Sequence, residues 1–137
     1  MNHMSYFMRF PKGRKKATTL SYDDGVTQDA RLVALMSEYG FKGTFNINAG
    51  SWYASNRNGA MSKEQAIQVY KDSGNEIAVH TYSHASLREL SPTHLTCEIL
   101  RDKAILEDTF GCIVRAMAYP FGFRLADNEE YVIRCVQ

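Results

Sequence analysis

Apolar and polar positions along the chain follow two periods in turn. Runs of β-branched and apolar residues predict strands over 17–22, 43–48, 76–80 and 115–119. Between these runs, apolar residues recur at spacings of three and four, which predicts helices over 27–40, 62–74, 91–111 and 127–136. Because strands that alternate with helices are joined by crossover connections, the pattern predicts an α/β fold with a parallel sheet.

Two of the predicted helices carry clear end signals. The segment 62–65 (Ser-Lys-Glu-Gln) has the form of a capping box, in which the first and last side chains bond to each other's main-chain N–H groups. Ser91 followed by Pro92 is typical of a helix start, and Gly111 is typical of a helix end. These signals favour helices beginning near residues 62 and 91.

Composition narrows the class of protein. The chain has 137 residues, the size of one domain, and its 45% hydrophobic and 23% charged residues are typical of a globular protein. A formal net charge of +1 gives no field that would favour nucleic acid or an anionic membrane as a partner. No apolar run approaches the roughly 18 residues that a membrane span needs. We therefore expect no nucleic-acid partner and no membrane span.

The start of the chain differs in character from the rest. Basic residues are concentrated in segment 9–16, so we expect residues 1–15 to form a basic leader and residues 16–137 to form one domain. Residues 1–10 are too short and too polar for a signal peptide. The compartment therefore stays open: cytoplasmic as the chain stands, and secreted or cell-envelope if a leader has been removed.

Polar side chains gather where three of the predicted strands end. Asp23 and Asp24 follow the first strand, His80 and His84 follow the third, and a Pro-Phe-Gly turn over 120–122 follows the fourth. Taken singly, these features are also consistent with ordinary turns and surface histidines. Because parallel strands end at the same edge of a sheet, we expect the three segments to converge. A carboxylate and two imidazoles then form a hydrolytic type of metal site, with the second carboxylate beside it as a candidate base.

These segments resemble the motifs of the NodB-homology polysaccharide deacetylases, also called carbohydrate esterase family four. Residues 21–25 (Ser-Tyr-Asp-Asp-Gly) are similar to the family's Thr-Phe-Asp-Asp-Gly, residues 80–84 (His-Thr-Tyr-Ser-His) to its His-Ser/Thr-x-x-His, and residues 120–122 to its Pro-aromatic-Gly. The resemblance covers residues 16–137 and implies parallel βα units that form a partial, distorted (β/α) barrel. Because the chain stops at Gln137, before the family's further strands and motifs, we expect the domain to be incomplete at its C-terminus.

The resemblance also implies a metal set and a reaction. Asp24, His80 and His84 would bind a divalent metal, most commonly Zn²⁺, with Co²⁺, Ni²⁺ or Mn²⁺ as alternatives. Asp23 would be the general base. The implied activity is the removal of N- or O-linked acetyl groups from a carbohydrate polymer or oligomer, by a water molecule that the metal activates. The implied partner is thus an acetylated carbohydrate.

Further residues receive supporting roles from the same resemblance. The main-chain N–H of Phe121 would contribute to the oxyanion hole, and Pro120 and Gly122 would shape the loop around it. Thr81 would brace the histidine loop by hydrogen bonding.

Three aromatic residues are candidates for the substrate groove: Trp52, Tyr82 and Tyr119. Each of them is equally consistent with packing against the core. An uncovered edge of the predicted parallel sheet also favours self-association.

The sequence departs from the family pattern in two places. The family often has an arginine that orients the base, and the corresponding position here is Ala118; Arg115 has the opposite side-chain parity on the strand, which disfavours it as a replacement. The histidine that serves the family as general acid has no counterpart, because His94 and His3 are poorly placed. Two alternatives therefore stay open: a deacetylase-like module that binds metal or glycan with little or no catalysis, and a relative that hydrolyses a small cyclic amide.

Overall fold

A computed structural model describes residues 10–55, 59–121 and 130–136 of the chain. Its strands are β1 (Ser21–Asp23), β2 (Thr44–Ile47) and β3 (Glu76–Val79). Its α-helices are α1 (Asp29–Glu38), α2 (Lys63–Tyr70), α3 (Pro92–Phe110) and α4 (Glu130–Val136). Short 3-10 helices cover Pro11–Gly13, Ala49–Tyr53 and Leu87–Glu89.

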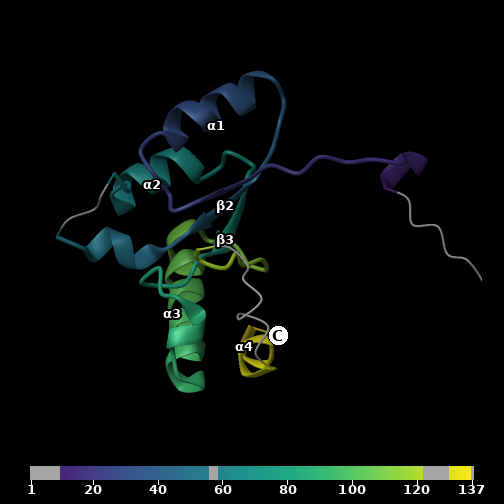
Figure 1. Cartoon of the computed structure of the whole chain (residues 1–137). Helices are drawn as coiled ribbons and strands as arrows, with labels where there is room; N and C mark the ends of the chain where they lie inside the picture. The colour runs from purple at the N-terminus through teal and green to yellow at the C-terminus, as the bar shows by residue number, and fades with distance from the viewer. Residues whose placement is uncertain (1–9, 56–58, 122–129, 137) are drawn as a thin grey trace, which may run out of the picture.

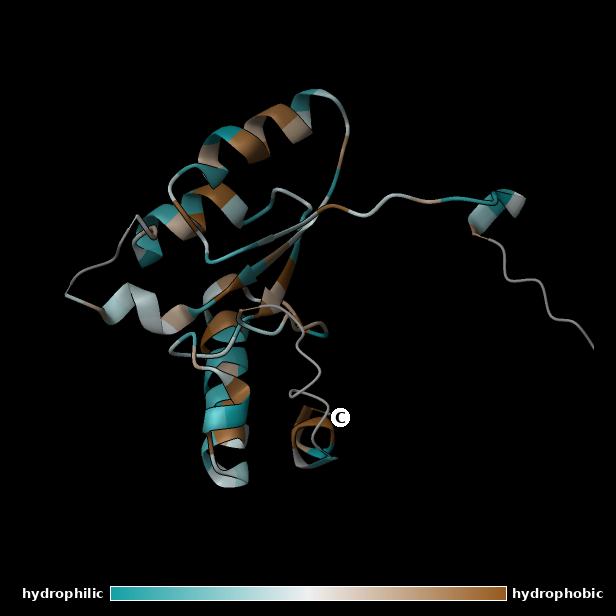
Figure 2. Ribbon diagram, in the orientation of Figure 1, coloured by the Kyte–Doolittle hydropathy of each residue, from teal (hydrophilic) through white to brown (hydrophobic). Residues whose placement is uncertain are grey.

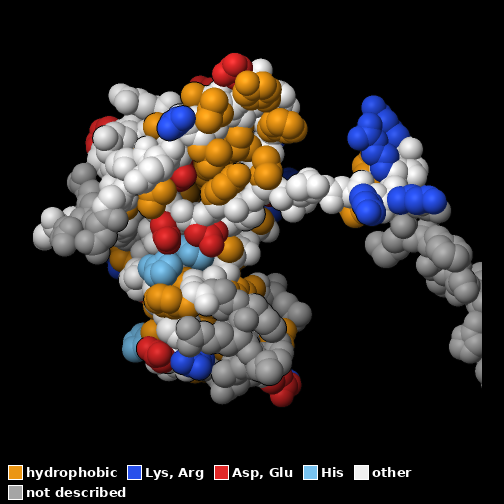
Figure 3. All heavy atoms as spheres, turned by 45° about the horizontal axis from the view of Figure 1, so that its top comes forward, with side chains coloured by type: hydrophobic (Ala, Val, Ile, Leu, Met, Phe, Trp, Pro, Cys, Tyr) orange, Lys and Arg blue, Asp and Glu red, His pale blue; other side chains and the backbone are white. Residues whose placement is uncertain are grey.

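The three strands form one parallel sheet in the order β1-β2-β3. Helix α1 packs beside α2, α3 packs against β3, and α4 packs against α3 (Figure 1). Segment 10–16, which holds several of the basic residues, extends away from the rest of the molecule (Figures 1 and 3). No helix in the described part of the chain combines the length and apolar character that crossing a membrane requires.

Alternate rows of the sheet have opposite character. Tyr22, Phe45 and Ile77 lie side by side in register and belong to the main hydrophobic core, which α1, α2 and α3 cover. Figure 2 shows hydrophobic positions gathered on the strands and on the helix segments next to them. The next row along the strands is Asp23, Asn46 and Ala78, whose side chains face the other way because successive residues of a strand alternate between faces. One face thus builds the core while the other carries polar groups.

The strand predicted over 115–119 is wrong in extent. Among the described residues this segment makes a single parallel bridge, between Met117 and Val79. The pairing ends there because the next donor would be the main-chain nitrogen of Pro120, which carries no hydrogen. The first strand is also shorter than predicted and begins later. It covers Ser21–Asp23 instead of 17–22, because these are the residues that pair with β2.

The predicted helix signals are confirmed. The main-chain N–H of Gln65 donates to the hydroxyl of Ser62, and the Gln65 side chain accepts from the main-chain N–H of Ser62, which completes the capping box of α2. Ser91 caps α3, and Gly111 ends it in the left-handed conformation. Of the helix predicted over 127–136, residues 130–136 form α4, and residues 127–129 lie outside the described part of the chain.

Candidate metal centre

Three potential metal ligands meet where the strands end. Asp24 follows β1, His80 follows β3, and His84 lies four residues further on; one ligand atom of each lies within 4.8 Å of the others. The Oδ1 atom of Asp24 is 3.2 Å from Nε2 of His84 and 3.6 Å from Nε2 of His80. Figure 3 shows the histidine side chains directly beside acidic ones on one face of the molecule. The three residues thus converge as the sequence predicts.

A hydrogen bond to the main chain orients the ring of His80. Its Nδ1 atom lies 3.0 Å from the carbonyl oxygen of Ala118, and the residue is 1% exposed. A carbonyl oxygen can only accept, so Nδ1 carries the proton and Nε2 keeps its lone pair. The free Nε2 atom is the one that faces Asp24. A bond from the second ring nitrogen to a carbonyl oxygen is the usual way in which proteins fix the tautomer of a metal-binding histidine.

A buried carboxylate holds the main chain on which His80 lies. Asp102 of α3 is fully buried and accepts the main-chain N–H groups of Ala49, at 2.7 Å, and of His80, at 3.1 Å. These two amides follow β2 and β3, so one side chain joins the ends of two neighbouring strands to the helix behind them. Burial raises the pKa of Asp102 to about 7, and the two N–H donors oppose part of that rise.

The backbone of the site adopts strained conformations. Of the six residues other than glycine that have a positive φ in the described part of the chain, four lie here: Asp24 at 76°, Thr81 at 62°, His84 at 57° and Phe121 at 62°. Such conformations are costly for residues with a Cβ atom and persist where the surroundings determine them. The hydroxyl of Thr81 accepts the main-chain N–H of Ala85 at 3.1 Å, a bond across the histidine loop of the bracing kind that the family resemblance implies.

A glycine allows the histidine loop to approach the end of β2. The main-chain N–H of Gly50 donates to the carbonyl oxygen of Tyr82 at 2.8 Å. A Cβ atom at position 50 would lie 2.1 Å from that oxygen, closer than real atoms approach, so a side chain there would displace the loop. Tyr82 stands midway between the two histidines, and its position therefore depends on this close contact.

The donor set fits a divalent transition metal. One carboxylate oxygen and two neutral imidazole nitrogens suit zinc and its neighbours, and a three-residue set leaves positions open for water and substrate. Asn48 adds a second indication: its Nδ2 atom lies 3.4 Å from Oδ1 of Asp24, while its own Oδ1 is buried and has no partner among the described residues. Buried polar atoms are normally paired, so this oxygen is available to a group that binds next to Asp24.

Within the Pro-Phe-Gly turn, Phe121 contacts one of the candidate metal ligands. The ring of Phe121 packs edge-on against His84, with ring centroids 4.6 Å apart, and Pro120 is buried. Gly122 lies outside the described residues. The expected convergence thus holds for the part of this turn that the structure describes.

The three aromatic candidates for the substrate groove lie in three different surroundings. Trp52 is only 5% exposed and packs against Phe110 in the core, so it is a packing residue rather than part of an open groove. Tyr82 lines a hollow of about 220 Å³ next to His84, and the guanidinium of Arg101 lies 3.7 Å from the centre of its ring. Tyr119 packs against a second, smaller hydrophobic cluster that includes residues of α3 and α4.

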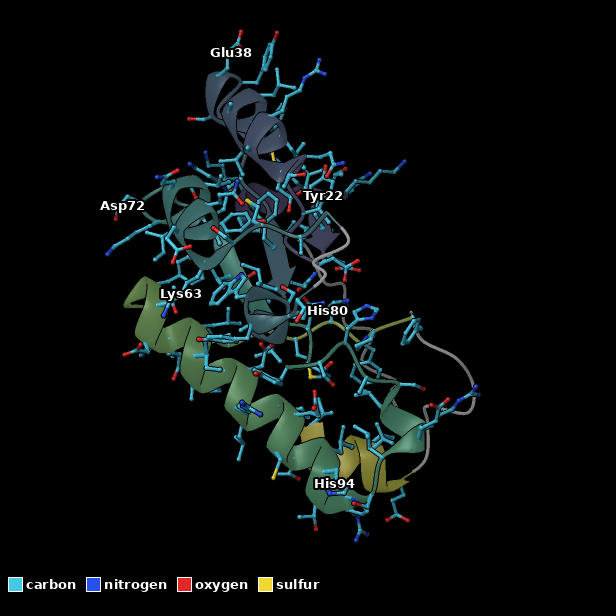
Figure 4. All side chains as sticks on the ribbon, turned by 90° about the vertical axis from the view of Figure 1, so that its left-hand side faces the viewer. Tyr22, Glu38, Lys63, Asp72, His80 and His94 are labelled. Atoms are coloured by element: carbon cyan, nitrogen blue, oxygen red, sulfur yellow. The ribbon has the colours of Figure 1, made fainter. Side chains whose placement is uncertain are left out.

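Arg115 and His94 are the residues nearest in type to the arginine and the histidine of the family pattern, and the structure shows where each of them lies. No ion pair among the described residues joins Arg115 to Asp23; the Oδ1 atom of Asp23 instead accepts a hydrogen bond from Nδ2 of Asn46 at 2.7 Å. His94 lies near the start of α3, well away from His80 (Figure 4). It is therefore not placed to act as a general acid at this site.

Sequence reasoning missed three polar residues that support the site: Asn46, Asn48 and Asp102. Each had a signal. Asparagine is depleted in strands, yet two asparagines occupy alternate positions at and just after β2. Asp102 interrupts the apolar stripe of α3 between Ile99 and Leu106, where a buried carboxylate needs partners.

Comparisons with known proteins bear on the family and the fold of this chain. The family model for polysaccharide deacetylase matches residues 10–134. Chitin deacetylase 1 from Cryptococcus neoformans var. grubii is 28% identical over 109 residues, which cover 79% of this chain and 22% of that protein. The deacetylase PplD of Streptococcus pyogenes, solved in complex with acetate, superposes with a TM-score of 0.73 at 23% identity over 89% of this chain and 52% of that one. A mutant of a CE4 family pseudoenzyme with restored enzymatic activity superposes with a TM-score of 0.66 at 19% identity. The match covers 87% of this chain and 42% of that one.

The chain therefore spans 22% of the length of this curated relative and about half of the PplD structure. The likeness to the solved structures shows the fold, and it confirms the expected α/β architecture of a partial (β/α) barrel. The family match extends over most of the sequence and includes all three motifs. The chain belongs to the polysaccharide deacetylase family.

Proposed function

We propose that this chain is a metal-dependent hydrolase that removes acetyl groups from a carbohydrate polymer or oligomer. The observation that carries the proposal is the cluster of Asp24, His80 and His84, whose ligand atoms lie within 4.8 Å of one another at the carboxyl ends of the strands. The fixed tautomer of His80 and the orphaned oxygen of Asn48 support a bound cation, for which Zn²⁺ is our first candidate and Co²⁺, Ni²⁺ and Mn²⁺ are the alternatives.

Each residue would have a distinct task in this reaction. A divalent cation supplies Lewis-acid chemistry, since it lowers the pKa of a bound water and polarises a carbonyl oxygen. Asp23 would take the proton of the attacking water on Oδ2, because Oδ1 is held by Asn46. The main-chain N–H of Phe121 would donate to the oxyanion that develops on the acetyl carbonyl; such a donor is typically worth about 2.7–4 kcal/mol.

The substrate class follows from family membership and from the surroundings of the site. Two curated relatives are chitin deacetylases, whose names state cleavage of an acetyl group from an aminosugar polymer. The hollow beside His84 is lined by Asn48, Ser51 and Tyr82, which offer an amide, a hydroxyl and an aromatic ring to a sugar. An N-acetylated or O-acetylated carbohydrate is thus the proposed partner.

Acetate release tests the proposal directly. The chain, supplied with Zn²⁺, is incubated with N-acetylated chito-oligosaccharides and, separately, with an O-acetylated oligosaccharide. We expect metal-dependent release that the Asp24→Ala variant loses. Release that persists in Asp24→Ala at the wild-type rate would rule out the metal mechanism.

One observation favours a second candidate, a module that binds metal or glycan with little or no catalysis. Position 118 holds alanine where the family often has the arginine that orients the base, and one structural neighbour is described as a CE4 family pseudoenzyme. Zinc and oligosaccharide binding by the wild-type chain, without acetate release from either substrate, would favour this candidate over the first.

A further inference from the structure

We propose that Asn46 is the positioning residue for Asp23, and that a neutral amide from β2 takes the place of the arginine missing at position 118. The inference rests on the proposed function, in which Asp23 is the general base. It concerns a residue that lies outside the three motifs and is not one of the candidate metal ligands.

The register of the sheet brings the two side chains together. Asp23 and Asn46 are partners in the parallel pairing of β1 with β2, so their side chains project from the same face. The neighbour of Asn46 on the other side is Ala78, which is small and leaves the amide directed toward β1. The resulting bond from Nδ2 of Asn46 to Oδ1 of Asp23 is 2.7 Å long.

The orientation of the Asn46 amide is determined by its partners. Its Nδ2 atom lies 2.9 Å from the hydroxyl of Ser21, 3.3 Å from the carbonyl oxygen of Tyr22 and 2.7 Å from the carboxylate of Asp23. The last two oxygens only accept hydrogen bonds, so the nitrogen and not the oxygen of the amide must face them. Asn46 is 2% exposed, and burial opposes rotation of its side chain.

The same residue also holds the neighbouring metal ligand, by a separate group. The main-chain carbonyl oxygen of Asn46 accepts the N–H of Asp24 at 3.0 Å, while the side chain binds Asp23. A substitution at position 46 removes the side-chain bond and keeps the main-chain one. The prediction is therefore selective: the base loses its orientation and the metal ligand does not.

Asp23 itself is exposed, so few other contacts hold it. The bond from Asn46 engages Oδ1, and no described residue donates to Oδ2. A carboxylate tied at one oxygen presents the other in a fixed direction, which is the requirement for a base that must reach a proton. Without the amide, the exposed side chain is free to change rotamer.

The Asn46→Leu variant tests this inference because leucine has a similar volume and no hydrogen-bond donor, and Asn46→Ala is made in case leucine disturbs folding. The matched control is Thr44→Val, which removes a side-chain bond to Glu76 from the same strand and does not touch Asp23. We expect Asn46→Leu to lower kcat for acetate release about ten- to hundredfold, with KM and zinc affinity within twofold of wild type. In an Asp23→Asn background the same substitution should add no further loss.

A second readout does not depend on turnover. Side-chain three-bond couplings in the NMR spectrum report whether Asp23 occupies one χ1 rotamer; we expect one rotamer in the wild-type chain and in Thr44→Val, and averaging in both Asn46 variants. A single Asp23 rotamer in every variant would overturn the inference, and so would a wild-type kcat in Asn46→Leu if the wild-type chain turns over. If Asp23→Asn keeps full activity, or if no form releases acetate, the proposed function fails and the rotamer measurement alone decides the role of Asn46.

Discussion

The Nδ1 atom of His80 donates to the carbonyl oxygen of Ala118 across 3.0 Å, and this bond ties a candidate metal ligand to the segment that follows α3. The same segment pairs with β3 at one point only: the N–H of Val79 donates to Ala116, and the N–H of Ala118 donates back to Val79. The carbonyl of Ala118 is thereby held in place beside the ring. A segment that contributes little to the sheet thus has a clear effect on the metal site.

This bond predicts the tautomer of His80 in solution. Long-range ¹H–¹⁵N spectra of the histidine rings should show the proton of neutral His80 on Nδ1, because the Ala118 carbonyl accepts it. His94, an exposed histidine near the start of α3, is the reference ring in the same spectrum. A proton on Nε2 of His80 would contradict the geometry described here.

Asp102 is predicted to matter for both stability and metal binding. In Asp102→Asn, the new NH₂ group faces one of the two main-chain N–H groups that the carboxylate now accepts, so one buried donor loses its partner. We expect urea denaturation to show a loss of about 1–3 kcal/mol. Zinc affinity, measured by calorimetry, should fall about tenfold, because the two main-chain segments that the carboxylate joins, one of which carries His80, are no longer both fixed.

The control for this experiment is Asp108→Asn, which makes the same chemical change at an exposed position of α3. It should leave stability and zinc affinity close to their wild-type values. Equal behaviour of the two variants would mean that the buried bonds of Asp102 have no net effect.

The buried pair of Asp29 and Tyr70 predicts a dependence of stability on pH. The Tyr70 hydroxyl donates to Asp29 at 2.6 Å; burial raises the pKa of Asp29 above its ordinary value of 3.8, and the bond from Tyr70 opposes part of that rise. The native state then binds more protons than the unfolded state between these two values, so the contribution of Asp29 to stability falls as pH rises through this window. Above the native pKa, the contribution is constant.

Asp29→Asn should remove this trend. The unfolding free energy of the wild type minus that of Asp29→Asn is expected to decline as the pH is raised from below 3.8, and then to level off. The exposed carboxylate of Asp72 is the control, since Asp72→Asn should run parallel to the wild type. A difference for Asp29→Asn that stays flat or rises over the same range would show that burial does not raise the pKa of this group.

The order of elements and the convergence of the candidate metal ligands could be predicted, because both depend on local pattern. Alternation of strands and helices predicts a parallel sheet, and the carboxyl ends of its strands must meet at one edge. Asp24 and His80 directly follow strands and His84 lies in the loop after the second of these, so their convergence needs no knowledge of side-chain packing. The sequence also held a signal against the predicted fourth strand, because Pro120 lacks the N–H donor that a longer pairing with β3 needs.

The contacts that support the site could not be predicted in the same way, because they depend on register. Which residue of β2 lies opposite Asp23 is decided by the pairing of two segments far apart in sequence, and a slip of one residue would put Phe45 or Ile47 there. The side chain of Asp102 likewise reaches main-chain groups in two segments far from it in sequence, just after β2 and just after β3. Trp52 illustrates the limit for aromatic residues, whose type suits both sugar binding and the core.

Zinc binding tests the central claim most directly, since the account depends on one cation held by Asp24, His80 and His84. Calorimetry of the wild-type chain should show one zinc ion bound, with Asp24→Ala weakened by more than the ~10–100-fold that loss of an outer-shell partner costs. The adjacent variant Asp23→Asn should keep wild-type affinity, because Asp23 is not a ligand in this arrangement. No zinc binding by the wild type, or equal affinity in Asp24→Ala, would contradict the account.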